Sequence, residues 1–371
     1  MRVLGVVVAV LLSLLVPGVS SASGGLAWVI KPTGTDAQLR GLSVVDARVV
    51  WASGSKGTVL RTVDGGASWA SVGPPDTAGL EFRDVEAFDA LNAVVLSIGP
   101  GDSSRIYRTV DGGRSWTLAF RNAEEKAFYD CVAFFDRWRG LAMGDPVDGK
   151  FRVLSTVDGG RSWTLVPESN FPPALEGEAG FAASGQCIAT SGPFDAWFAT
   201  GGGASARVLH SGDGGRHWKA SDTPLLSLPS AGVFAVAFRT PWQGIAVGGD
   251  YARPAEPVVG MALSGDRGRS WSVPAVAPVG YRSGVAWRGA SVIAVGPTGS
   301  DVSVDGGRRW RSFDGGSFDT VDCGWGRVCW ASGGKGRGGG VAGIVGGGSV
   351  EPRILRLSPW PLWLVKAGKM P

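Results

Sequence analysis

Six copies of one eight-residue pattern constrain the fold of this chain more than any other feature. Each copy has Ser or Thr, any residue, Asp, any residue, Gly, two further residues and Trp, as in residues 109–116. Successive aspartates lie 47, 47, 55, 53 and 39 residues apart, and they are Asp64, Asp111, Asp158, Asp213, Asp266 and Asp305. Self-similarity at steps of this size is typical of a repeat array in which each copy is one structural unit.

The pattern predicts a tight turn between two strands. Residues 58–61, 105–108 and 151–154, which precede three of the copies, are rich in strand-forming side chains. Glycine accepts positive φ, the Asp side chain can bond backbone N–H groups a few residues on, and the Trp ring supplies a large buried surface. Because turn and packing needs explain every residue of the pattern, we expect the six aspartates to have a structural role.

The six copies resemble the Asp-box, also called the BNR repeat. This repeat occurs in sialidases, in sortilin-like receptors and in the photosystem II stability/assembly factor family, all of which are β-propellers with the box between the third and fourth strands of a blade. Over most of residues 26–335 the chain looks most like the photosystem II stability/assembly factor-like group. Photosynthetic members of that group are scaffolds that bind newly made membrane-protein segments, so the resemblance implies binding without catalysis.

A second repeated pattern predicts the number of blades. Pairs of apolar segments precede each box, and a seventh pair lies in residues 318–333, where no box follows. We therefore expect an all-β, seven-bladed β-propeller of four-stranded antiparallel blades. Residues 336–349 are mostly glycine and small residues, which resist a fixed strand. We expect N- and C-terminal strands to close the ring, with residues 26–30 as the N-terminal strand.

The ends of the chain differ from its body. Residues 1–22 combine Arg2, an apolar run and a small-residue cleavage site, which predicts a signal peptide and a secreted protein, either periplasmic or extracellular. Residues 23–350 form the predicted propeller domain. Residues 351–371 are an atypical basic, aromatic tail, for which a closing strand, a flexible end and sequence drift are the main alternatives and contact with a membrane surface is a minority interpretation. The net charge is +4, of which residues 1–22 contribute +1 and residues 351–371 contribute +3. The body is neutral, which argues against a nucleic-acid partner.

Four cysteines are disulfide candidates in an exported chain. Cys323 and Cys329 flank a short turn, and Cys131 and Cys187 lie in equivalent strands of consecutive blades. Four buried free thiols are the alternative, because connectivity cannot be deduced from spacing alone. With two histidines in the chain and no Cys-x-x-Cys pair, we expect no metal site and no cofactor.

Candidate binding residues lie at the end of the ring opposite the boxes. Aligned first strands place Arg40, Arg83 and Arg282 at equivalent positions, where they are expected to converge on a carboxylate, an acidic peptide or a glycan. In the alternative, each Arg pairs with an Asp between blades and only stabilises the ring. The complete candidate set is Arg40, Arg83, Tyr129, Asp145, Asp148, Asp250, Tyr251, Arg282 and Asp301.

Two functions are compared. The first is an exported, non-catalytic, monomeric scaffold that binds a protein or membrane-protein segment. The second is a sialidase-like glycoside hydrolase, whose chemistry needs three Arg, a Tyr nucleophile with a Glu partner, and an Asp acid/base. Residues 23–61 lack the Arg-Ile-Pro-like motif of sialidases, and neither Tyr251 nor Tyr281 has an obvious Glu partner. The scaffold is therefore the favoured function, and an adhesion or receptor propeller is a third alternative.

Overall fold

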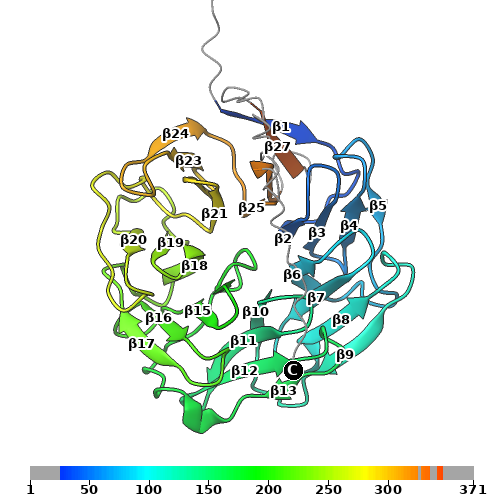
Figure 1. The fold of residues 1–371 in the computed structure, drawn as a ribbon, viewed down its shortest axis with the longest axis horizontal. Helices are drawn as coiled ribbons and strands as arrows, with labels where there is room; N and C mark the ends of the chain where they lie inside the picture. The colour runs from blue at the N-terminus through cyan, green and yellow to red at the C-terminus, as the bar shows by residue number, and fades with distance from the viewer. Residues whose placement is uncertain (1–25, 325–326, 335–340, 346–371) are drawn as a thin grey trace, which may run out of the picture. The chain divides into compact units, whose positions relative to one another are not determined.

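The computed structural model describes residues 26–324, 327–334 and 341–345 of the chain. Residues Ala27–Val345 form one compact unit of antiparallel sheets around a central axis (Figure 1). The predicted signal peptide, residues 1–22, and the atypical tail, residues 351–371, lie outside the described residues. No helix in the described part of the chain has the length and apolar character needed to cross a membrane.

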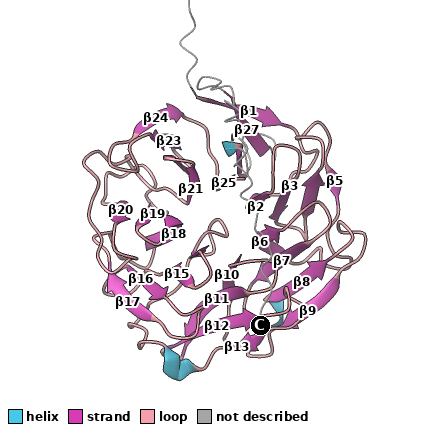
Figure 2. Cartoon of the chain, in the orientation of Figure 1, coloured by secondary structure: helices cyan, strands magenta, loops and turns pink. Residues whose placement is uncertain are grey.

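The sheets follow one another along the chain, and Figure 2 shows that strands dominate the unit. Sheet one contains β2 (Leu39–Val44), β3 (Val50–Gly54), β4 (Val59–Thr62) and β5 (Ala70–Ser71). Sheet two contains β6 (Glu81–Ala87), β7 (Ala93–Ile98), β8 (Arg105–Thr109) and β9 (Thr117–Arg121). Sheet three contains β10 (Tyr129–Phe134), β11 (Gly140–Val147), β12 (Lys150–Thr156) and β13 (Thr164–Leu165).

The second half of the unit continues in the same order. Sheet four contains β14 (Ile188–Ser191), β15 (Asp195–Ala199), β16 (Arg207–Ser211) and β17 (Lys219–Asp222). Sheet five contains β18 (Ala231–Thr240), β19 (Gln243–Asp250) and β20 (Met261–Ser264). Sheet six contains β21 (Gly284–Arg288), β22 (Ser291–Gly296), β23 (Gly299–Ser303) and β24 (Arg311–Asp314). The closing sheet contains β1 (Ala27–Lys31), β25 (Thr320–Cys323), β26 (Cys329–Ser332) and β27 (Val341–Val345). Two short 3-10 helices are η1 (Gly101–Ser103) and η2 (Glu168–Asn170).

The prediction of seven four-stranded blades is wrong, because the structure contains six four-stranded blades. Sheet five has only three strands. After its turn, Ser272 exchanges two backbone hydrogen bonds with Leu263, at 2.8 and 2.9 Å, and the pairing then stops. Pro274 and Pro278 follow. Proline lacks the N–H that a strand ladder needs, so this segment cannot extend into a regular fourth strand.

The hydrophobic core lies between neighbouring sheets. Val94, Leu96 and Ile106 of sheet two pack with Val132 and Leu154 of sheet three in one buried cluster. Similar clusters join sheets five and six and sheets one and two. Because a middle strand is covered on both faces, it is apolar along its length, and all five residues of β3 are buried. Interdigitated sheet faces of this kind are what hold a propeller together.

Each repeated turn is closed by its own side chains. In residues 109–116, Thr109 Oγ1 donates to Asp111 Oδ1 at 2.9 Å and accepts from Gly113 N at 2.9 Å. Ser115 donates its backbone N–H and its hydroxyl to the two Asp111 oxygens, at 3.0 and 2.6 Å. Gly112 and Gly113 have φ of 78° and 81°, which glycine adopts without strain. The hydroxyl of Ser115, and then its N–H, lower the pKa of Asp111 to about 2.

Side chains of the first strands also bond across sheet boundaries. Asp322 Oδ2 accepts from Val44 N and Asp84 Oδ2 accepts from Val132 N, each at 2.7 Å. Four of the first strands, β2, β6, β10 and β18, carry a register shift, and each is the edge strand of its sheet, so some of its backbone groups face away from the ladder. The neighbouring sheet therefore satisfies donors that would otherwise be buried without a partner.

The ends of the compact unit meet in the closing sheet. Strand β1 pairs with β27 in antiparallel register, from Ala27 opposite Val345 to Lys31 opposite Val341. Trp28 of β1 is buried and donates from Nε1 to Ser300 Oγ of sheet six at 3.0 Å. Its ring also lies 5.5 Å from that of Phe318. Strand β1 thus connects the last part of the described chain to sheet six.

Candidate binding site

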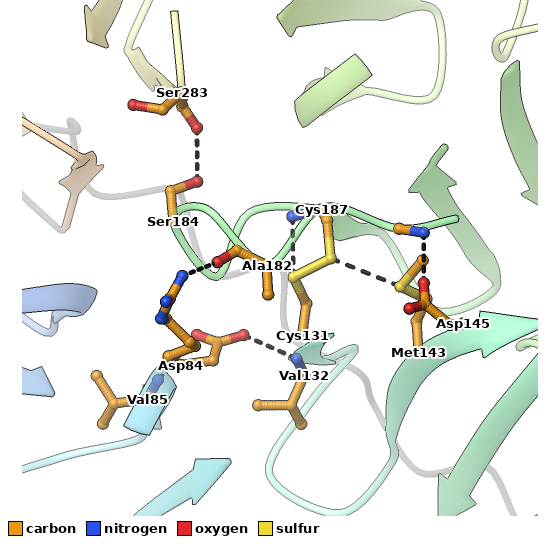
Figure 3. Close-up of a disulfide and its surroundings, with 12 residues drawn as sticks. Asp84, Val85, Cys131, Val132, Met143, Asp145, Ala182, Ser184, Cys187 and Ser283 are labelled. Carbon is orange, nitrogen blue, oxygen red and sulfur yellow. Dashed lines mark hydrogen bonds between the residues drawn. A yellow bond between two sulfur atoms is a disulfide. The ribbon is translucent and has the colours of Figure 1, made fainter. Parts of the chain in front are cut away.

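A segment ahead of sheet four crosses the central axis of the ring. Residues 181–187 precede β14, which begins at Ile188. Ser184 Oγ donates to the Ser283 carbonyl of the sheet six region at 2.6 Å (Figure 3). The Gln186 amide bonds to both backbone groups of Val285 at 3.1 Å, and to the Val321 carbonyl at 2.8 Å. We call residues 181–187 the crossing segment.

The crossing segment is also held on the side of sheets two and three. The Ala182 carbonyl accepts from Arg83 Nη1. Gly185 has φ of 72°, and a Cβ at this position would lie 2.5 Å from Asp84 Oδ1, so only glycine fits here. The structure contains a disulfide between Cys131 of β10 and Cys187, with 6.0 Å between their Cα atoms (Figure 3). A second disulfide joins Cys323 and Cys329 across β25 and β26.

Two cavities lie on either side of the crossing segment. One has a volume of about 610 Å³ and is lined by Ser184, Gly185 and Gln186 together with the later residues of the first strands. Asp84, Glu86 and Asp322 face it, and burial raises the pKa of each of these carboxyl groups. The other has a volume of about 630 Å³ and is lined by residues 181–183 and by residues near the start of the first strands. We call the second one the funnel cavity.

One wall of the funnel cavity is aromatic. The rings of Phe181 and Phe234 stack with 4.1 Å between their centroids, and Tyr281 meets Phe234 at 4.7 Å. Tyr281 is buried, and this burial raises the pKa of its hydroxyl far above its usual range. Tyr251 lies 6.1 Å from Phe234, with 54% of its surface exposed. This wall offers flat apolar surface and one exposed ring to a ligand.

The opposite wall is polar and positively charged. Asp319 Oδ2 accepts from Gln38 Nε2 at 3.0 Å and lies 3.9 Å from Arg40 Nε. Arg40 Nε has no hydrogen-bond partner among the described residues. Arg83 forms an ion pair with Glu81 at 3.0 Å, and burial, followed by the charge of Arg40, lowers the pKa of its guanidinium. Two guanidinium groups therefore lie within electrostatic range of each other beside the cavity.

The third arginine of the predicted cluster does not join the other two. Arg282 is buried and donates to Asp301 Oδ2 from two nitrogens, at 2.7 and 2.6 Å. It also donates to Thr298 Oγ1 at 2.8 Å. This geometry agrees with the alternative in which an arginine pairs with an aspartate and stabilises the ring. Arg282 and Asp301 satisfy each other and leave no group for a ligand.

The remaining candidates are separate from the funnel cavity. Tyr129 is buried against Phe120, and burial raises its pKa to about 12. Asp145 accepts from Gly180 N at 2.7 Å, and burial raises its pKa to about 6. Asp148 is exposed beside Lys126, at 3.3 Å, and Asp250 is buried beside Arg253, at 3.0 Å. Of the nine candidates, the structure places Arg40 and Tyr251 on the cavity wall and Arg83 next to it.

Sequence reasoning missed the crossing segment, although one signal for it existed. The step from Asp158 to Asp213 is 55 residues, eight more than the two steps before it. The preceding loop is rich in glycine and small residues, from Gly180 to Gly185. Extra length with this composition indicates a loop with a separate place in the fold. In the described residues, no three His, Cys, Asp or Glu side chains are grouped to hold a metal ion.

Comparison with known proteins supports the fold. No protein-family model matches the sequence, and no curated protein matches it. A solved structure of YCF48 bound to a D1 peptide superimposes with a TM-score of 0.60 at 16% identity, covering 86% of this chain and 96% of that one. YCF48 from Cyanidioschyzon merolae has the same score and identity, covering 85% and 98%. U3-55K has a TM-score of 0.59 at 12% identity, covering 86% and 97%. At these identities the similarity establishes a β-propeller fold and carries no function.

Proposed function

We propose that this protein is a non-catalytic β-propeller scaffold that binds a segment of another protein in the funnel cavity. The observation that carries the proposal is the pairing of an aromatic wall, with Tyr251 exposed, and a wall where Arg40 Nε has no hydrogen-bond partner among the described residues and lies 3.9 Å from Asp319 Oδ2. A peptide that places an apolar side chain against the first wall and a carboxylate against the second would use both. Arginine binds carboxylates through two parallel hydrogen bonds.

The structural relatives support a peptide ligand. One of them is described as YCF48 bound to a D1 peptide, which makes a peptide complex a property of that protein. In this proposal, the six repeated turns are Asp-boxes and the chain resembles the photosystem II assembly factors in its binding role as well as in its fold. The crossing segment closes the inner end of the funnel cavity. A ligand would therefore bind at the open end of the cavity and would not pass through the ring.

Export belongs to the same proposal. Residues 1–22 are the predicted signal peptide, and they would direct the chain to a periplasmic or extracellular location. The two disulfides support this location, since disulfides persist in oxidising compartments and are rare in the cytosol. A thiol assay of protein recovered from the periplasm or the medium, with and without prior reduction, tests the location and the two bridges together. Free thiols in the native protein, or cytosolic retention, would count against export.

The first prediction concerns the charged wall of the cavity. Peptides with a free C-terminus, selected from a displayed random library on the wild-type protein, should bind the double variant Arg40→Gln/Arg83→Gln about tenfold more weakly or worse, since a hydrogen bond to a charged group is worth about 1.5–3 kcal/mol. Amidation of the same peptides should weaken binding to wild type to a similar extent. Fluorescence anisotropy measures both effects.

Arg282→Ala provides the matched control for this test. It removes an arginine that is already paired with Asp301, so it should lower the melting temperature and leave peptide affinity unchanged in the folded fraction. Equal affinity of wild type and the Arg40/Arg83 variant would refute the cavity as the peptide site. Turnover of a fluorogenic sialoside by wild type would instead favour the glycoside hydrolase.

A further inference from the structure

The hairpin tips at the end of the ring opposite the funnel cavity form a second surface, which we call the turn face. In several sheets the hairpin between the first and second strands contacts the repeated turn of the same sheet. Gly112 N donates to the Leu91 carbonyl at 2.9 Å, Gly159 N to Trp138 at 2.8 Å, and Gly214 N to Phe194 at 2.8 Å. Both tips of sheets two, three and four therefore lie side by side at the same end of the molecule.

Large apolar side chains are exposed at these tips. Leu91, Trp138, Phe194 and Trp242 occupy the hairpin tips of sheets two to five, with exposed fractions of 49%, 57%, 54% and 55%. In the turns, Val157 and Val304 are also largely exposed. Isolated exposed apolar residues are ordinary on protein surfaces, but a series on one face in consecutive sheets marks an interaction site.

Contacts between sheets show that the tips form a continuous arc. Arg139 of sheet three donates to the Pro193 carbonyl, next to Phe194, at 3.1 Å. Arg267 of sheet five lies 3.8 Å from Asp195, and its guanidinium is 4.7 Å above the ring of Trp242. The exposed rings of sheets three, four and five are therefore neighbours on one surface.

The aspartates and arginines of the turn face differ in how far their charges are available to a ligand. The aspartate of each repeated turn directs its oxygens to backbone N–H groups within the turn, as Asp266 and Asp305 do at 3.0–3.1 Å. By contrast, Arg269, Arg308 and Arg309 are exposed and have no side-chain partner among the described residues. The turns of sheets five and six each carry two arginines for one aspartate. An anion that approaches this sector meets guanidinium groups first.

We propose that the turn face docks on an anionic lipid surface. Trp138, Phe194 and Trp242 would enter the headgroup region, where aromatic rings are favoured, and Arg269, Arg308 and Arg309 would contact lipid phosphates. The apolar side chains stand on separate hairpin tips, with Arg139 and Arg267 between them, which suits a deformable charged layer better than a protein groove. In this orientation the funnel cavity faces away from the lipid, so the inference goes beyond the peptide-binding proposal and does not depend on it.

The test is vesicle flotation of the chain from Ser23 to Pro371, which retains the whole compact unit Ala27–Val345. The vesicles are phosphatidylcholine alone or phosphatidylcholine with phosphatidylglycerol. Wild type should float with the anionic vesicles only, and added salt should release it. The variant Arg269→Gln/Arg308→Gln/Arg309→Gln should bind between about tenfold and a hundredfold more weakly, since each basic residue near such a surface changes binding about fivefold.

The matched control removes the same charge at the other end of the ring. Lys56 and Lys126 are exposed in loops of the funnel end, and Lys150 is exposed at the first position of β12. Replacement of all three by Gln should leave flotation unchanged. A second variant, Trp138→Ser/Phe194→Ser/Trp242→Ser, should also lose flotation while its melting temperature stays near that of wild type. Equal flotation of the arginine and lysine variants, equal binding to neutral vesicles, or no flotation of wild type would each overturn the proposal.

Discussion

Asp130 and Asp145 carry two carboxyl groups that are largely buried and close enough to affect each other's charge. Asp145 accepts a hydrogen bond from Gly180 N, whereas Asp130 Oδ2 has no partner among the described residues. Burial, followed by the charge of Asp145, raises the pKa of Asp130 well above its usual range, and burial raises the pKa of Asp145 to about 6. The pair is therefore more favourable to the fold when it carries a proton.

The pH dependence of the unfolding free energy of an Asp145 variant tests whether the neutral carboxyl group stabilises the fold. The folded-state pKa of about 6 exceeds the ordinary value of 3.8, so the favourable contribution of the neutral group is complete below about pH 4 and is lost as pH rises through 6. Asp145→Asn keeps an oxygen for Gly180 N and removes the charge. Its unfolding free energy should equal that of wild type near pH 4 and exceed it at pH 8 by up to about 3 kcal/mol.

Denaturant melts at several pH values measure this difference. The exposed Asp148→Asn serves as the control and should show no difference that grows with pH. An Asp145→Asn protein that is less stable than wild type at pH 8 would show that the ionised carboxylate supports the fold.

Among the elements, the repeated turns depend mostly on local bonds. Thr156 Oγ1 donates to Asp158 Oδ1 at 2.8 Å and accepts from Gly160 N at 3.0 Å, and Thr156 is buried. Thr156→Val keeps the shape of the side chain and leaves the Gly160 donor without its acceptor. We expect a loss of about 1–3 kcal/mol, which is the usual effect of leaving one buried polar group unsatisfied. Thermal unfolding measures it.

The neighbouring Ser155 is a suitable comparison, because its hydroxyl makes only a long contact of 3.4 Å to the Thr164 carbonyl. Ser155→Ala should change stability by less than about 0.5 kcal/mol, as is usual for surface positions. If both variants behave alike, then the threonine hydroxyl does not hold the turn closed.

The strand pairs and repeated turns could be predicted from the sequence, whereas the crossing segment and the number of four-stranded blades could not. The strand pairs and turns could be predicted because each is specified by side chains within a few residues, as in residues 109–116. The number of four-stranded blades was mispredicted because each repeated turn was taken to be followed by a full fourth strand, whereas Pro274 and Pro278 follow the turn of sheet five. The crossing segment was missed since its partners, including Ser283 and Val321, lie about 100 residues or more away.

Contacts between residues far apart in the sequence also explain why only some of the candidate site residues lie at the funnel cavity. Aligned first strands place equivalent residues at equivalent heights, so Arg40 and Arg83 lie close together as the alignment suggests. Alignment of the strands carries no information on side-chain partners. It therefore could not predict that Arg282 is bound to Asp301 and not available to a ligand. Tyr251 and the aromatic wall come together through loops of different sheets, which no single repeat encodes.

For the whole molecule, stability depends on how the ring is closed. Trp28 connects β1 to sheet six through Ser300 and packs against Phe313 and Phe318, at 5.7 and 5.5 Å. Trp28→Ala should lower the unfolding free energy by about 3–5 kcal/mol, the usual effect of removing a buried aromatic side chain. Chemical denaturation measures the change, with the half-exposed Val29→Ala expected to lose less than about 1 kcal/mol. Similar losses for both variants would mean that β1 contributes little to closure.

Pairing of β1 with β27 also sets an order of events during synthesis. Strand β1 leaves the ribosome early, but its partner β27 is the last described strand. Strand β1 therefore stays unpaired until the sheets between β1 and β27 have been synthesised. Contacts between such distant residues form slowly, and an unpaired edge strand is exposed to wrong partners in the meantime. A chain that stops before Val341 lacks the strand that β1 needs. Closure of the ring therefore requires that synthesis has passed β27.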